Sequence, residues 1–309
     1  MKTVFMGTPD FAAVVLDSVV KAGFEVGYVI TQPDKARDRG KKIQFTPVKE
    51  KALEYGLEVL QPEKVRENAA LLEQLQEYRP DIIIVVAYGQ ILPKELLELP
   101  ELGCVNVHAS LLPKLRGASP IQNAIVTGET VTGVTIMQMG EGLDTGDMLT
   151  KVEVEIGRMN GEQLHDALAE AGAKLLVETL PKLEAGQITP QPQDDSQSTY
   201  VGLIRKADGK IDFRKTPEEI ERLIRGFDPW PGAFCDCSGT VMKLWAAQPL
   251  NQTCEQEPGT VLRTGEEGMD VSCGGRILRV TEIQMPGKKR VFVKDYLRGN
   301  SIAAGTLLK

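Results

Sequence analysis

The chain has 309 residues, of which 42% are hydrophobic and 26% charged, and its formal net charge is −7 at pH 7. These values are typical of a globular protein of about two domains, and the absence of an apolar run of roughly 18 residues excludes a membrane-spanning helix. The negative net charge argues against extensive contact between the protein surface and nucleic acid. Residues 205–309, however, carry 17 Lys and Arg against 14 Asp and Glu, which permits a local phosphate-binding face.

Strands and helices alternate through the first part of the chain. Short apolar runs, clearest at residues 82–86, are separated by segments whose apolar residues recur at helical spacing. Continuous apolar strands of this kind predict a parallel sheet covered by helices on both faces. The predicted strands cover residues 2–6, 26–30, 58–60, 81–86, 104–107, 133–139 and 148–156, and the predicted helices cover about 10–22, 46–55, 63–78, 120–126 and 161–184.

Two segments lack this periodicity. Residues 31–44 are expected to form a mobile loop, and residues 188–198, with two prolines, have the composition of a linker. A helix at 217–225 is followed by short strands at 233–237, 241–246, 259–262, 269–273 and 277–283, a spacing that predicts a small OB-like barrel. The expected fold class is therefore α/β, with a Rossmann-like parallel-sheet domain over 1–188, a linker over 189–204 and an OB-like β-barrel domain over 205–309.

The cysteines point to neither disulfides nor a metal. There are five of them, an odd number, and the spacing of Cys235 and Cys237 is wrong for half of a zinc site, with no histidine nearby. The N-terminal run also lacks the length and cleavage site of a signal peptide. We expect free thiols, no metal, a cytoplasmic location and, since nothing demands a dimer, a monomer.

Asn106 and His108 are the first candidate site residues. They lie two positions apart in a predicted strand, so their side chains share one face, and the turn Ser110-Leu-Leu-Pro113 follows directly. An amide can donate to a carbonyl oxygen that becomes an oxyanion, and histidine carries protons near neutral pH. A purely structural role for the histidine remains open on the residues alone.

A carboxylate and a second histidine complete the inventory of proton carriers. Asp144 lies in the glycine-rich turn 140–146, where it could orient His108, although a solvated turn residue is the commoner case. His165, on the polar side of a predicted helix, is expected to be an ordinary surface residue.

The predicted loop holds four cations, and the first turn holds a glycine. Arg37, Arg39, Lys41 and Lys42 fall within six residues. Such a run of charges is most often a solvated surface, but it also suits binding of phosphate or of a nucleic-acid end.

The turn Gly7-Thr-Pro-Asp10 follows the first strand but lacks the G-x-G-x-x-G pattern, so a nicotinamide cofactor is poorly supported.

Taken together, these motifs resemble the folate-dependent formyltransferase family over essentially the whole chain. The general signature is Asn106-x-His108-x-Ser110-Leu-Leu-Pro113 with Arg116-Gly117, and Asp144 in Gly-Leu-Asp-Thr-Gly-Asp. Several further stretches resemble the branch of that family that acts on charged initiator tRNA, namely residues 5–11, 31–34, 39–42, 86–89, 133–139, 211–212 and 229–231. The sequence departs from the family pattern at two places: Ala109 stands where many relatives have glycine, and Arg37-Asp38 comes just before Arg39. Neither departure affects the residues expected to carry the reaction.

The resemblance implies transfer of a formyl group from 10-formyltetrahydrofolate, as co-substrate, to the α-amino group of methionine on initiator tRNA. Asn106, His108 and Asp144 inherit the catalytic roles, and Ser110, Leu111, Leu112 and Pro113 inherit contacts to the folate. The implied tRNA contacts come from the loop cations Arg37, Arg39, Lys41 and Lys42 and from a barrel face with Arg205, Lys206, Lys210 and residues 288–290 as candidates.

Three alternatives stay open on the sequence. A formyltransferase acting on a sugar nucleotide or small amine would not need the basic loop or the barrel. An oxidoreductase on a similar fold would bind a nicotinamide cofactor tightly, and a non-catalytic RNA-binding module would bind tRNA without formyl transfer.

Overall fold

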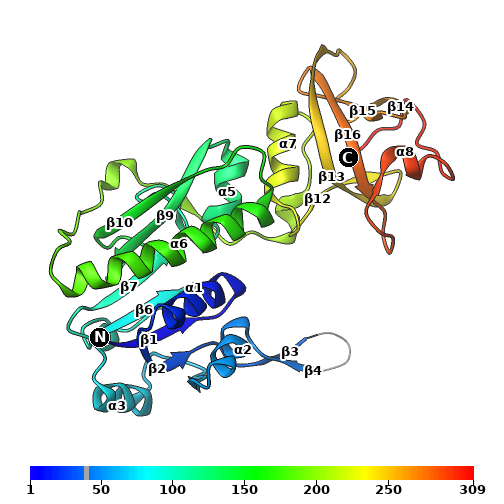
Figure 1. Ribbon diagram of the computed structural model, residues 1–309. Helices are drawn as coiled ribbons and strands as arrows, with labels where there is room; N and C mark the ends of the chain where they lie inside the picture. Colours follow the sequence, from blue (N-terminus) through cyan, green and yellow to red (C-terminus); the bar gives the residue numbers. More distant parts are fainter. Residues whose placement is uncertain (38–41) are drawn as a thin grey trace. The chain divides into compact units, whose positions relative to one another are not determined.

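The computed structural model describes residues 1–37 and 42–309, and Figure 1 traces them. They divide into two compact units that are each assembled from separate stretches of chain. The predicted limits at 188 and 204 stay a prediction, but residues as far as Val201 belong to the first unit. The first unit comprises Met1–Gly117, Val131–Glu155 and His165–Val201, and the second comprises Ala118–Thr130, Ile156–Leu164 and Gly202–Lys309.

A mainly parallel sheet forms the centre of the first unit, as predicted. Within the described residues it has seven strands in the order β10-β9-β7-β6-β1-β2-β5. The five strands from β7 to β5 run parallel, whereas β9 pairs antiparallel with β7 and β10 with β9. The strands are β1 (Lys2–Gly7), β2 (Glu25–Ile30), β5 (Glu58–Leu60), β6 (Ile82–Val86), β7 (Cys104–His108), β9 (Val131–Gln138) and β10 (Met148–Glu155).

Helices cover this sheet through their apolar sides. Leu71 and Leu75 of α3 pack in one cluster with Val4 and Met6 of β1. On the long α6, a Cβ atom at Gly172 would lie 3.0 Å from Cγ1 of Val107, so glycine allows that helix its close approach to β7. The helices with residues in this unit are α1 (Asp10–Lys21), α2 (Pro47–Glu54), α3 (Ala69–Tyr78), α4 (Lys94–Leu97) and α6 (Gly161–Glu184).

Two predictions in this unit need correction. Helix α3 begins at residue 69 rather than 63, because Glu67 has φ +59° and the Asn68 side chain accepts from the Leu71 N–H as an N-cap. The segment 31–44, predicted as an irregular loop, contains the paired strands β3 (Lys35–Arg37) and β4 (Lys42–Gln44). Cross-strand backbone pairing needs no apolar periodicity, so the composition did not reveal it.

The C-terminal part of the second unit is a closed antiparallel barrel, which agrees with the predicted OB-like architecture. Its strands follow the order β12-β13-β16-β15-β14, with β17 on β16. The last residues close the barrel, since Leu308 bridges Cys237 and Leu307 bridges Thr260. The strands are β12 (Ala233–Cys237), β13 (Thr240–Thr253), β14 (Val261–Gly265), β15 (Gly268–Cys273), β16 (Arg276–Gln284) and β17 (Val291–Phe292).

Helices α5 and α7 pack on each other in the second unit. Thr216 and Glu219 form a capping box at the start of α7, each side chain accepting from the other's backbone N–H. In the described part of the chain, no helix is long and apolar enough to cross a membrane. The remaining elements are β8 (Arg116–Gly117), which pairs with β11 (Tyr200–Val201) in the first unit, α5 (Pro120–Thr127), α7 (Pro217–Gly226), α8 (Val293–Tyr296) and the 3₁₀ turns Asp195–Gln197 and Lys206–Gly209.

Candidate active site

The structure brings together the three residues that the sequence singled out as catalytic. Asn106 and His108 lie on one face of β7. Just after β9 the chain still lies beside β7, because the Met139 N–H donates to the Cys104 carbonyl. The turn that comes next places Asp144 beside the side chains of Asn106 and His108. Nδ2 of Asn106 lies 3.5 Å from Oδ1 of Asp144, and Nδ1 of His108 lies 3.7 Å from Oδ2. A donor, a proton carrier and a carboxylate therefore converge at one point.

His108 is held at its other ring nitrogen. Its Nε2 lies 3.0 Å from the carbonyl oxygen of Leu115, and the side chain is only 6% exposed. A carbonyl oxygen can only accept, so Nε2 must carry a proton. This leaves Nδ1 as the nitrogen that faces Asp144.

Asp144 is fixed by the backbone of the turn that follows β7. Its Oδ2 accepts a hydrogen bond of 2.8 Å from the Gly117 N–H. Asp144 itself has φ +52°, an uncommon conformation for a residue with a side chain, and Leu115 has φ +57°. At Gly146 a Cβ atom would lie 1.8 Å from the Gln138 carbonyl oxygen, so this turn requires glycine there. Unusual backbone conformations of this kind cluster at functional sites.

The turn 109–117 is stabilised chiefly by Thr135 of the neighbouring strand β9. Oγ1 of this buried threonine donates to the Ser110 carbonyl at 2.7 Å and accepts from the Leu112 N–H at 3.1 Å. The Ser110 hydroxyl donates to the Lys114 carbonyl at 2.6 Å. Thr135 lies in the stretch 133–139 that carries part of the family resemblance, but its role was not predicted because it depends on the pairing of β9 with β7.

The four expected folate-contact residues differ in accessibility. Ser110 and Leu112 are buried, so their side chains shape the turn, whereas Leu111 and Pro113 are half-buried. Of the four side chains, those of Leu111 and Pro113 are the more accessible to a ligand.

A second group of site residues lies in the segment predicted as a linker. Nε2 of Gln193 donates to the carbonyl oxygens of Asp144 and Gly146, at 2.8 and 2.7 Å. Its Oε1 accepts from Nε of Arg116, which is 1% exposed and also bonds Asp195 and Tyr200. Composition alone gave no signal for Gln193, because a glutamine among prolines is typical of a solvated connector.

No thiol competes as a nucleophile beside these residues. Cys104 lies on the same strand, but burial raises its pKa to about 12, so the thiol is protonated at neutral pH. All five cysteines are free. Within residues 1–37 and 42–309, no group of three or more His, Cys, Asp or Glu side chains is arranged to hold a metal ion.

The expected tRNA-binding cations fall in both units. Arg37 ends β3 and Lys42 begins β4, while Arg39 and Lys41 lie outside the described residues. In the second unit, Arg205, Lys206 and Lys210 are exposed at and beside a 3₁₀ turn.

Arg290, predicted as a candidate phosphate contact, is paired with two carboxylates. Its guanidinium bonds Asp228 and Glu282, each at 2.8 Å, and lies 4.7 Å from the Trp245 ring centroid. Ion pairing neutralises this charge, whereas Lys288 and Lys289 are exposed. The sequence could not distinguish the three because the partners of Arg290 are distant along the chain.

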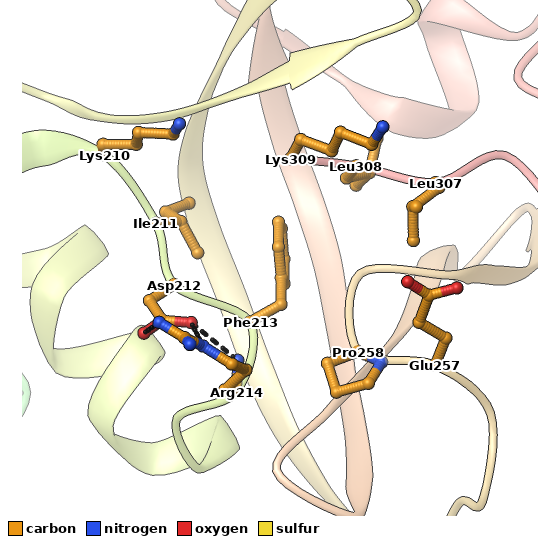
Figure 2. A pocket seen from close by; sticks show the side chains of 10 residues that line it. All are labelled: Lys210, Ile211, Asp212, Phe213, Arg214, Glu257, Pro258, Leu307, Leu308 and Lys309. Atoms are coloured by element: carbon orange, nitrogen blue, oxygen red, sulfur yellow. Dashed lines mark hydrogen bonds and ion pairs between the residues drawn. The ribbon is translucent and has the colours of Figure 1, made fainter.

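The barrel holds a pocket of ≈ 450 Å³ with Lys210 at its rim. Figure 2 shows Lys210 and Lys309 along one side, Asp212 hydrogen-bonded to Arg214, and Glu257 opposite. The carboxylates of Asp212 and Glu257 offset much of the positive charge, so the pocket lacks the strong single-sign character of a phosphate site.

His165 is not the plain surface residue that the helix pattern predicts. Its side chain is 25% exposed, its ring contacts Phe11 edge-on with centroids 5.6 Å apart, and its nitrogens lie 3.5 Å from Asp10 and 3.0 Å from Asp166. The hydrogen bond with Asp10 is the largest cause that raises the pKa of His165. It ties α6 to the start of α1.

The chain is similar to known formyltransferases in sequence and in fold. Residues 1–180 match the family described as formyl transferase, and residues 203–301 match its C-terminal domain. The methionyl-tRNA formyltransferases of Lachnospira eligens and Clostridium novyi are each 49% identical to the chain, covering all of it and 99% and 100% of their own lengths. An N-formyltransferase from Helicobacter canadensis, solved with folinic acid and dTDP-3-aminofucose, shares the fold with TM-score 0.67 and 20% identity, covering 92% of this chain and 99% of that one.

Proposed function

The chain belongs to the formyl transferase family, and we propose that it transfers the formyl group of 10-formyltetrahydrofolate to the α-amino group of methionyl initiator tRNA. The observation that carries this proposal is the convergence of Asn106, His108 and Asp144 in a chain whose full-length relatives are methionyl-tRNA formyltransferases. We also propose that the protein supports translation initiation and that it works in the cytoplasm as a monomer.

The reaction needs no covalent intermediate with the protein. The amino nitrogen attacks the formyl carbon, a C–N bond forms, and the carbonyl electron pair moves onto oxygen. The bond to N10 of the folate then breaks, the amine loses a proton and N10 gains one, so the transfer is redox-neutral. The protonated thiol of Cys104 is consistent with direct attack by the amine.

Asn106 and His108 stabilise the developing oxyanion in this proposal. Nδ2 of Asn106 is a neutral donor, and the Nδ1–H of protonated His108 is a charged one, because Nε2 already donates to Leu115. Each donor of this type contributes roughly 10²–10³ in rate.

Asp144 has a different role, as proton acceptor and as partner of the imidazolium. Its carboxylate lies within 3.7 Å of His108 and is fixed by the Gly117 N–H, so it can orient the ring and receive the proton released by the amine. A proton taken up here then reaches N10 through water or His108.

Substrate binding divides between the units. The turn 110–113, with Leu111 and Pro113 more accessible than their neighbours, is the proposed folate contact. The cations Arg37, Arg39, Lys41 and Lys42 and the exposed Arg205, Lys206 and Lys210 are the proposed contacts to tRNA phosphates. In this proposal, residues 1–188 carry the chemistry and the loop cations that contact the tRNA, and residues 205–309 add further tRNA contacts.

The deciding experiment is formyl transfer by the purified chain from 10-formyltetrahydrofolate to methionyl initiator tRNA. Methionyl elongator tRNA and uncharged initiator tRNA are the controls. Formylmethionine formed on the initiator alone supports the proposal. Transfer to an amino-sugar nucleotide but to no tRNA would overturn the acceptor while keeping the chemistry.

A further inference from the structure

Gln193 spans the turn that carries Asp144. Its two amide hydrogens go to two carbonyl oxygens of that turn, those of Asp144 at 2.8 Å and Gly146 at 2.7 Å. These oxygens lie on either side of Thr145, so one side chain fixes the backbone directions at both ends of a three-residue stretch. The contact holds the part of the chain from which the Asp144 carboxylate projects.

The orientation of this amide is dictated by chemistry. An amide offers donors on nitrogen and acceptors on oxygen, and a guanidinium only donates. Nε of Arg116 donates to Oε1 of Gln193 at 2.9 Å, so the amide nitrogen must face the two carbonyls. Arg116 is itself fixed, being 1% exposed and bonded to Tyr200 at 2.9 Å and to Asp195 at 2.8 Å.

Two links therefore run from the Arg116-Gly117 pair to Asp144. The Gly117 N–H binds the carboxylate directly, and the Arg116 side chain reaches the Asp144 backbone through Gln193. Asp144 holds φ +52°, a conformation that a free turn would seldom keep. With both its side chain and its backbone anchored, the carboxylate is directed at His108 and Asn106.

We infer that Gln193 is a positioning residue that sets the Asp144 carboxylate for catalysis through the buried Arg116, an inference that rests on the proposed function. It touches neither substrate nor reacting atoms in this role. Its effect should therefore be on the rate of the chemical step rather than on substrate binding.

Two substitutions test this. Gln193→Met keeps the side-chain length but removes both donors, and Gln193→Glu keeps the acceptor for Arg116 but turns a carboxylate oxygen towards two carbonyl oxygens. Both are expected to lower kcat by about 10²-fold while KM for either substrate changes less than about threefold. Gln197→Met is the matched control, because Gln197 is an exposed glutamine of the same segment whose side-chain amide donates to Asp194 rather than to the turn of Asp144.

A second readout does not depend on activity. The chain has two histidines, so its imidazole NMR spectrum is simple. In Gln193→Met the resonances of His108 should move, because the neighbouring carboxylate moves, while those of His165 should stay. A folded Gln193→Met protein with wild-type kcat, or with an unchanged His108 signal, would overturn the inference. Absence of formyl transfer by the wild-type chain would instead refute the proposed function and leave the NMR test valid.

Discussion

His108 faces Asp144 with one ring nitrogen and a backbone carbonyl with the other. Nδ1 lies 3.7 Å from Oδ2 of Asp144, and Nε2 lies 3.0 Å from the Leu115 oxygen. When the ring is protonated both nitrogens donate: Nε2–H faces the Leu115 oxygen, whereas Nδ1–H lies beyond hydrogen-bond distance of Asp144 and stays available to a substrate oxygen. The same Oδ2 accepts from the Gly117 N–H, so the turn after β7 fixes the ring and the carboxylate together.

Asp144→Asn tests the carboxylate directly. The amide keeps the size of the side chain and an oxygen for the Gly117 N–H, but it can neither balance the charge of the imidazolium nor take up a proton. We expect kcat to fall by about 10²–10⁴-fold with the fold intact. Steady-state formyl transfer is the measurement, and Glu141→Gln, an exposed carboxylate in the same loop, should leave it unchanged.

Thr135→Val should destabilise the turn that follows β7. The substitution is close in shape but leaves the buried Ser110 carbonyl and Leu112 N–H without their hydroxyl partner. The expected loss in unfolding free energy is about 1–3 kcal/mol, measured by urea denaturation. Thr135→Ser, which retains the hydroxyl, should recover most of it; equal losses for both variants would show that the methyl group contributes as much as the hydroxyl and would contradict the prediction.

Lys49→Met should weaken tRNA binding through the hairpin β3–β4. The Lys49 ammonium bonds Asp34 and Gln61, at 2.5 and 2.6 Å, and lies 4.1 Å from the Phe45 ring centroid, so it contacts the residue before β3 and the residue after β4. We expect KM for charged tRNA to rise about tenfold, or about 1.4 kcal/mol. Folate affinity, measured by fluorescence, should stay constant.

Lys94→Met is the control for this hairpin test. Lys94 is 63% exposed and pairs only weakly with Glu98 at 3.5 Å. If Lys49→Met weakens folate and tRNA binding equally, the lysine supports the whole sheet edge rather than the hairpin.

Removing Arg205, Lys206 and Lys210 together should flatten the salt dependence of tRNA binding. Each phosphate contact releases a counterion, so replacing all three with alanine is expected to reduce the log–log slope by about 2–3. The triple alanine variant of Lys151, Lys174 and Lys182, exposed lysines of the first unit, is the charge-matched control. Equal slopes for the two variants would exclude this barrel face as the tRNA contact.

His165 should stabilise the first unit more at low pH than at high pH. Its folded pKa is raised, mainly by Asp10, so its contribution is present below the unfolded value of about 6.5 and is lost as pH rises through the folded pKa. His165→Gln should therefore lower Tm by about 1–3 °C at pH 6 and by less at pH 9. Glu170→Gln, an exposed change on the same helix, provides the baseline; a larger loss at pH 9 would contradict the assignment.

Local pattern was sufficient for much of the fold and for the centre of the site. The apolar run of β6 and the two-residue spacing of Asn106 and His108 follow from the period of a strand, which each short stretch of chain encodes by itself. The proximity of Asp144 to these residues came from the family resemblance, since spacing alone left it a turn residue.

The tertiary structure decided which polar groups meet. Gln193 and Arg116, in segments predicted as linker and signature, support Asp144, and Arg290, predicted as a phosphate contact, forms an ion pair with Asp228. Closure of the barrel by the last residues was likewise set by pairing at long range. Burial periodicity is a local property that a sequence displays, whereas a hydrogen bond between distant residues depends on how whole elements pack, and only the folded chain determines that.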